Sequence, residues 1–173
     1  MIFGSSLFGI EVGELTPEAG TGTTLIQFRF IVDDHEIGDW EDRIRLRDSL
    51  HYTKAFLDCK GNRMRTDLAG ADSDDVFKKL YEDFYDYEYD YSSASLQNPN
   101  LRDRFHLDDI GLGAISDRFG LLIVEISKED SRIIVKKFAD SVIVADQRIR
   151  SVDVDKVFQE YLKWGASQIG NVT

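Results

Sequence analysis

Alternating apolar and polar positions in the first forty residues predict β-strands. Leu7 to Val12 is an apolar run, and large apolar residues alternate with polar ones from Thr24 to Val32. Such alternation is typical of a strand with one buried face. Asp33-Asp34 has the composition of a turn, after which His35 to Trp40 returns as a short strand. Between the first two strands, Glu14 to Thr23 is interpreted as a polar connection.

Three segments carry apolar residues at helical spacing. The first runs from about Arg45 to Asp58 and ends near Gly61-Asn62. The second follows Ser73, a favourable N-cap, and its apolar stripe contains Val76, Phe77, Leu80 and Phe84. The third follows Asp153 as its cap, with one apolar face made of Val154, Val157, Phe158, Tyr161 and Leu162.

Three apolar runs in the C-terminal third predict a meander. Leu121 to Ile126, Arg132 to Phe138 and Val142 to Ala145 are separated by short polar turns, and consecutive strands joined in this way pair antiparallel. Together with the helices, the pattern predicts an α+β fold in which about three helices pack against an antiparallel sheet of hairpins and meanders. Because no repeat or linker interrupts the chain, we expect residues 1–173 to form a single domain.

Charge and cysteine content narrow the classes of partner. The 173 residues carry a net charge of −11 at pH 7. A strongly negative surface repels nucleic acids and anionic membranes and attracts basic partners, although solubility alone would also explain it. We therefore expect neither nucleic acid nor membrane as a partner. With a single cysteine, Cys59, and no signal-peptide pattern, the chain is expected to be cytoplasmic.

Signals for catalysis are weak. Gly20 to Thr24 has the glycines of a phosphate loop but lacks its lysine and its helix, so a hairpin connection is the better interpretation. No His-x-x-x-His pair offers metal ligands on one helix face. His106 and Asp108 would share a strand face and resemble half of a metal site, but a surface histidine beside solvated carboxylates is the favoured interpretation. We expect no catalytic residue, no metal and no cofactor.

An unusual segment follows the second predicted helix. Between Leu80 and Tyr91, five of the seven tyrosines are interleaved with Asp and Glu. Tyrosine is enriched at protein interfaces, and neighbouring carboxylates attract a basic partner. Nucleic-acid binders interleave their aromatic residues with basic ones instead. The predicted partner-binding residues are Glu82, Asp83, Asp86, Tyr87, Glu88, Tyr89, Asp90 and Tyr91.

The same segment has a purely structural interpretation. Leu80 and Phe84 are expected in the core, and the acids could simply face water beside tyrosines that pack on the sheet. Alternation at a period of two would place Tyr87, Tyr89 and Tyr91 on one side of an extended stretch. That side could face a partner or the protein interior, and both interpretations stay open.

Five short motifs stand out along the chain: Met1 to Gly4, Phe8 to Glu11, Phe28 to Val32, Ile37-Gly38-Asp39 and Leu46 to Leu50. In these motifs the chain resembles a known family, the bacterial polymorphic-toxin immunity proteins called immunity protein 42. A weaker likeness continues through Arg104 to Asp108, the strands around Ile123 and Ile134, and Val154 to Phe158. In order and spacing the resemblance covers most of the chain. The tyrosine-rich segment and the Gly20 to Thr24 stretch depart from the family pattern.

The resemblance implies a cytoplasmic antidote that binds and neutralises a cognate toxin in a stoichiometric complex, without catalysis. The acidic charge favours a toxin with a basic cleft, such as a nuclease, because carboxylates complement a phosphate-binding surface. Two alternatives stay open. One is an acidic regulatory or adaptor protein with another basic partner, and the other is a small hydrolase that uses His106, Asp108 and Asp109. The oligomeric state also stays open.

Overall fold

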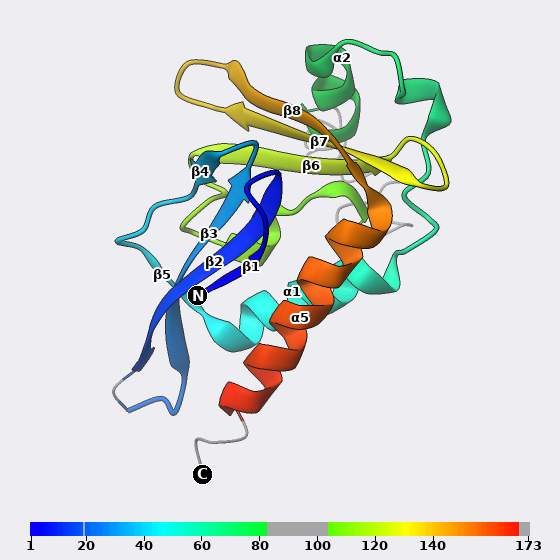
Figure 1. Cartoon of the computed structure of the whole chain (residues 1–173). Helices are drawn as coiled ribbons and strands as arrows, with labels where there is room; N and C mark the ends of the chain where they lie inside the picture. Colours follow the sequence, from blue (N-terminus) through cyan, green and yellow to red (C-terminus); the bar gives the residue numbers. More distant parts are fainter. Residues whose placement is uncertain (19, 83–103, 170–173) are drawn as a thin grey trace, which may run out of the picture.

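The strands of the computed structural model fall into two antiparallel sheets (Figure 1). The structure describes residues 1–18, 20–82 and 104–169. Its strands are β1 (Ile2–Gly4), β2 (Phe8–Pro17), β3 (Thr24–Val32), β4 (His35–Ile37), β5 (Arg43–Arg45), β6 (Phe119–Glu125), β7 (Asp130–Lys137) and β8 (Val142–Arg150). The α-helices are α1 (Leu46–Asp58), α2 (Ser73–Phe77) and α5 (Ser151–Ile169), and the short helical turns are η1 (Thr66–Leu68), η2 (Lys78–Glu82) and η4 (Asp108–Gly111).

The first sheet is built from the N-terminal third of the chain. Its strands lie in the order β1-β2-β3-β4, and β5 pairs with the start of β3. Gly20 to Thr24 belongs to the β2–β3 hairpin, as the sequence predicts. However, β2 continues to Pro17 through a stretch that the composition predicts as a polar connection. A register shift between Val12 and Leu15 lets the ladder continue past the irregularity.

The second sheet is the predicted meander β6-β7-β8. Strand β6 is apolar at nearly every position because both of its faces are covered. Leu121 and Ile123 face the larger core, whereas Leu122 and Val124 face a smaller core beneath α2 and η2. The antiparallel α+β fold class is thereby confirmed. The division of the strands into two sheets is a feature that the pattern did not predict.

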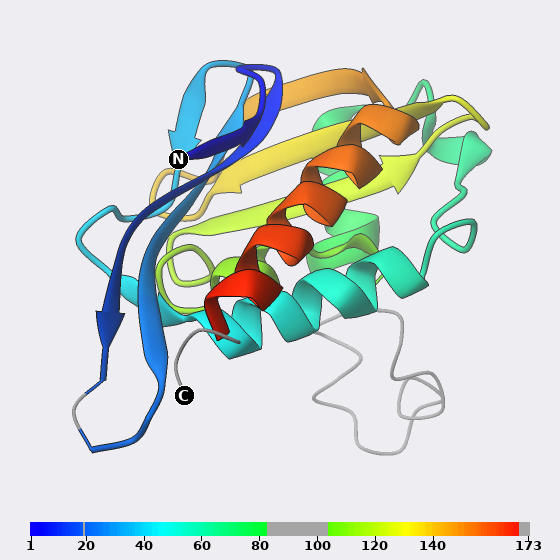
Figure 2. The same ribbon diagram turned by 60° about the horizontal axis from the view of Figure 1, so that its bottom comes forward.

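Helices α1 and α5 lie side by side and pack against the same side of the first sheet (Figures 1 and 2). The larger core fills the space between them and both sheets. Aromatic rings meet at its centre. The ring centroid of Phe158 on α5 lies 5.5 Å from that of Phe8 and 5.0 Å from that of Phe56. This packing leaves the opposite face of the first sheet without a helix among the described residues.

The buried stripe of α1 is more polar than predicted. It consists of Leu46, Ser49, Thr53 and Phe56, whereas the apolar Leu50, Ala55 and Leu57 of the same helix are only half-buried. The Ser49 hydroxyl lies 2.8 Å from the Tyr161 hydroxyl, and Thr53 donates to the Ser49 carbonyl at 2.7 Å. These hydrogen bonds allow two hydroxyls to occupy a buried face.

Both predicted N-caps are displaced. Helix α2 begins at Ser73, and its cap is Asp72, whose side chain accepts from the Asp74 amide at 2.9 Å. Helix α5 begins at Ser151, so Asp153 lies in its first turn, where it binds Arg150. A carboxylate in a first turn still complements the helix dipole.

Candidate partner-binding surfaces

The partner-binding segment predicted from the sequence falls almost wholly outside the described residues. Only Glu82, the last residue of η2, is among them, and the excluded residues are Asp83, Asp86, Tyr87, Glu88, Tyr89, Asp90 and Tyr91. Just before the segment, Leu80 is buried as expected, and Tyr81 is buried beside it. The predicted core residue Phe84 also lies outside the described part of the chain. The binding role of this segment therefore stays a prediction.

The residues of the hydrolase alternative are buried, which corrects the expectation of a solvated surface group. His106, Asp108 and Asp109 are 2%, 0% and 5% exposed. Nor do they share a strand face, because Asp108 begins the helical turn η4. The Nε2 atom of His106 lies 2.9 Å from the Leu80 carbonyl oxygen. The His106 ring also stacks on the Tyr81 ring, with 4.6 Å between their centroids.

Burial perturbs the pKa of the Asp108 carboxyl. Burial raises the pKa of Asp108 to about 7, and the charge of Asp109 adds to the increase. The hydrogen bond from the Tyr81 hydroxyl, at 2.9 Å, acts in the opposite direction. The Leu121 amide donates to the other carboxyl oxygen at 3.4 Å. Asp108 therefore ties η2 to β6 from inside the protein, which is a structural use of the group.

Metal ligands do not gather in the described part of the chain. No three His, Cys, Asp or Glu side chains there could hold a metal ion together.

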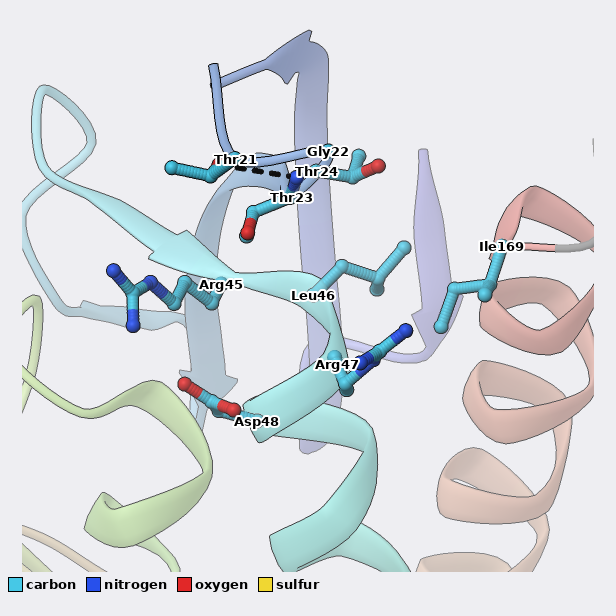
Figure 3. A pocket seen from close by; sticks show the side chains of 9 residues that line it. All are labelled: Thr21, Gly22, Thr23, Thr24, Arg45, Leu46, Arg47, Asp48 and Ile169. Carbon is cyan, nitrogen blue, oxygen red and sulfur yellow. Dashed lines mark hydrogen bonds between the residues drawn. The ribbon is translucent and has the colours of Figure 1, made fainter. Parts of the chain in front are cut away.

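A shallow hollow lies where the β2–β3 hairpin, the start of α1 and the end of α5 meet (Figure 3). It is lined by Thr21, Gly22, Thr23, Thr24, Arg45, Leu46, Arg47, Asp48 and Ile169. The Thr21 hydroxyl donates to Glu18 at 2.8 Å and accepts from the Thr23 amide at 3.2 Å. Arg45 and Arg47 point away from one another (Figure 3). The lining thus offers neither an activated nucleophile nor a converging pair of cations.

The helix-free face of the first sheet presents a continuous set of outward side chains. We call it the outer sheet face, and define it by Ile2, Glu11, Gly13, Leu25, Gln27, Arg29, Ile31, Glu36 and Trp40. Cross-strand pairing places Ile2 opposite Glu11 and Glu11 opposite Arg29. In the next register position, Ile31 lies opposite Glu36. Residues directly opposite each other in an antiparallel pair point to the same side of the sheet.

Arg29 and Trp40 form the centre of the outer sheet face. The Arg29 guanidinium lies over the Trp40 ring, 4.5 Å from its centroid. It also pairs with Glu11 at 2.6 Å and with Glu36 on the neighbouring strand. The Arg29 side chain is only 18% exposed because these three groups surround it.

Two further contacts position Trp40 against the sheet. Gln27 donates to the Trp40 carbonyl at 3.1 Å. A Cβ on Gly13 would lie 2.8 Å from the indole, so glycine is what lets the ring approach strand β2. No sequence pattern singled out this arrangement, because the β3–β4 turn is what brings Trp40 back over its neighbours.

The loop that carries Trp40 is anchored to the interior. Gly38 has a φ of +130°, a backbone conformation that favours glycine. The Asp39 amide donates to the Ala114 carbonyl at 2.9 Å. The pKa of Asp39 is lowered, first by the hydrogen bond from the Glu41 amide and then by Arg118. This loop therefore keeps an ionised carboxylate beside Trp40.

The fold is shared with a solved structure, CdiI from Burkholderia dolosa AUO158. The two chains are 12% identical with a TM-score of 0.64, and the alignment covers 95% of this chain and 99% of that chain. This similarity establishes the class of fold. No curated protein sequence matches the chain.

The family follows from the sequence itself. The profile of immunity protein 42 matches residues 1–164, so the chain belongs to the immunity protein 42 family. The predicted resemblance is therefore confirmed, and the chain has the role of an immunity protein, which binds and neutralises a cognate toxin. Within the described residues, no helix is long and apolar enough to cross a membrane.

Proposed function

We propose that this immunity protein neutralises its toxin by stoichiometric binding, without catalysing a reaction on it. The observation that carries the proposal is the family match over residues 1–164. The buried cluster of His106, Asp108 and Asp109 agrees with it, because these side chains serve internal hydrogen bonds and packing. Toxin neutralisation then results from steric blockade of the surface to which the antidote binds.

The chemistry of the immunity protein indicates what kind of toxin it fits. Its net charge of −11 favours a partner with a basic surface, because opposite potentials speed encounter and suppress wrong partners. Nuclease toxins fit this description, since they bind phosphate through basic clefts. The complex would form in the cytoplasm, the reducing compartment that suits a chain with a single cysteine.

The tyrosine-rich segment remains part of the proposed interface. Residues 82–91 combine tyrosines, which offer large contact areas with few rotatable bonds, and carboxylates, which pair with Lys and Arg. No other stretch of the chain has a comparable density of both. We assign to it a share of the contact with the toxin.

The decisive experiment uses the cognate toxin domain. Its induction should stop bacterial growth, and coexpression of the immunity protein should restore growth. Titration of purified toxin should reach full inhibition at a fixed molar ratio, and mass spectrometry should find the inhibited toxin chemically unchanged. Neutralisation by a small fraction of an equivalent, or a covalent change in the toxin, would establish an enzyme instead.

A further inference from the structure

We propose that the outer sheet face is a docking surface for the toxin, with Trp40 and Arg29 at its centre and carboxylates at its border. The occupant is a protein surface rich in Lys and Arg. The inference rests on the proposed function and adds a location to it. The hollow of Figure 3 is lined by other residues and is not part of this face.

The composition of the face is the first argument. The solvated side of an antiparallel sheet is normally polar. Here Leu25 and Ile31 are half-buried, Ile2 is 56% exposed and Trp40 is partly exposed. Tryptophan and arginine are the residue types most enriched among those that dominate binding energies. An apolar and aromatic centre surrounded by charge is the usual anatomy of a protein interface.

The rigidity of the centre is the second argument. Arg29 is fixed by Glu11, Glu36 and the indole, while Gln27 fixes the backbone of Trp40. Because these side chains already occupy one arrangement, binding costs them little further conformational entropy. A solvated sheet face has no need of a tryptophan held in this way.

The negative charge around the outer sheet face indicates that its partner is a basic protein. Residues 1–45 contain nine carboxylates and three arginines, so this quarter of the chain carries more than half of the net charge of −11. Glu14 and Glu36 are 68% and 61% exposed at their side chains, and Asp33, Asp34, Glu41 and Asp42 are also exposed. A basic protein complements this border, whereas nucleic acid or a second copy of the chain would meet like charge.

The test compares two surface variants with matched controls. Trp40→Ala removes the central ring, and Glu36→Lys reverses a border charge. The controls lie on the β7–β8 hairpin: Phe138→Ala removes a ring that is 37% exposed, and Asp140→Lys reverses a carboxylate that is 60% exposed and paired with Lys137. Each exchange of acid for lysine changes the net charge equally, so overall charge is controlled.

We expect Trp40→Ala to weaken binding of the toxin domain by at least about 30-fold, with Phe138→Ala changing it less than about 5-fold. Glu36→Lys should slow association several-fold more than Asp140→Lys does. Thermal melting identifies any variant that loses its fold, in which case Trp40→Phe and Glu36→Lys decide the question.

Three outcomes would contradict the proposal, and they are distinguishable. If the wild type protects cells but Trp40→Ala and Glu36→Lys bind as tightly as it does, the toxin docks elsewhere and the proposed function stands. If the wild type neither binds nor protects, the proposed function itself fails. If the wild type sediments as a dimer that Trp40→Ala converts to a monomer with unchanged toxin affinity, the face belongs to a second copy.

Discussion

Several buried polar side chains of this immunity protein hydrogen-bond a partner on another element. Asp108 accepts from Tyr81 and from the Leu121 amide, while Ser49 and Tyr161 share a hydrogen bond between α1 and α5. Burial also raises the pKa of Tyr161, which keeps its hydroxyl protonated and able to hydrogen-bond Ser49. At the residue scale, such pairs position one element against another.

The raised pKa of Asp108 predicts a specific pH dependence of stability. Because this pKa moves from its ordinary value of 3.8 to about 7, the folded chain retains a proton that the unfolded chain has released. The stability contributed by the group is thus fully present below about pH 4 and declines as the pH rises to about 7. Asp108→Asn, which cannot ionise, should lose this decline.

Urea unfolding of both proteins at several pH values measures the effect. Relative to the wild type, Asp108→Asn should gain stability between pH 4 and pH 8 by up to about 4 kcal/mol, the linkage value for a shift of this size. Two unfolding free energies that change in parallel over this range would show that Asp108 ionises in the folded protein as it does in the unfolded chain.

A buried ion cluster joins three elements at the far end of α1. Arg63, in the loop after α1, pairs with Glu125 of β6 at 3.0 Å and with Asp155 of α5 at 3.2 Å. Its guanidinium also lies 4.0 Å from the centroid of the Phe56 ring. Lys60 contributes a second cation, 2.5 Å from Asp155. The cluster therefore sets how α5 meets the edge of the second sheet.

We predict that Arg63→Met lowers the free energy of unfolding by about 3–5 kcal/mol, because it removes the cation that pairs with the buried Glu125 and leaves Asp155 with Lys60 alone. Lys54→Met is the matched control, since it breaks an exposed pair with Asp58 and should cost no more than about 0.5 kcal/mol. Chemical denaturation measures both variants. Equal losses in the two variants would mean that the cluster contributes no more than a surface pair.

The tyrosine-rich segment gives a second prediction at the element scale. Single replacements of Tyr87, Tyr89 and Tyr91 by alanine should weaken toxin binding, with a central ring costing roughly 2 kcal/mol or more. Replacing a neighbouring carboxylate at the rim should cost about 0–1 kcal/mol. Affinity and thermal stability are measured together. Reduced stability, or binding that survives all three changes, would assign these rings to the core and the toxin to another surface.

The sequence predicts best those elements in which apolar residues recur at the regular spacing of a strand or a helix. Strands β3, β6 and β7 and helix α5 have long apolar patterns, whereas β1 and β5 have three residues each and show no period. The buried stripe of α1 could not be predicted from apolar spacing, because Ser49 and Thr53 become suited to burial only through hydrogen-bond partners that the fold supplies.

The candidate binding surfaces differ in the same way: features local in sequence can be predicted, and contacts made only by the fold cannot. Density of tyrosine and acid is visible along the chain, so residues 82–91 could be proposed directly. The outer sheet face cannot be recognised in the sequence. Its residues Glu11, Arg29 and Glu36 are far apart along the chain, and they become neighbours only when β2, β3 and β4 pair. Spacing alone also mistook His106 and Asp108 for neighbours on one strand.

The whole molecule is an acidic body whose charge is unevenly distributed. Residues 1–45, which form the first sheet and its loops, carry more than half of the net charge of −11. An uneven field of this kind orients a basic partner during approach as well as attracting it. This charge distribution would therefore guide a basic toxin, the partner expected of an immunity protein, toward the outer sheet face.

Electrostatic steering predicts how salt affects formation of the complex. The Debye length falls from about 30 Å at 0.01 M salt to about 8 Å at 0.15 M, so distant charges lose most of their attraction. Because the net charge of −11 acts mainly before contact, the association rate should fall about 10-fold or more over this range, with a much smaller change in dissociation. Stopped-flow mixing with the cognate toxin measures both rates. Glu36→Lys combined with Glu41→Lys should associate more slowly at low salt and show a shallower dependence on salt. An association rate that does not respond to salt would mean that the acidity serves solubility alone.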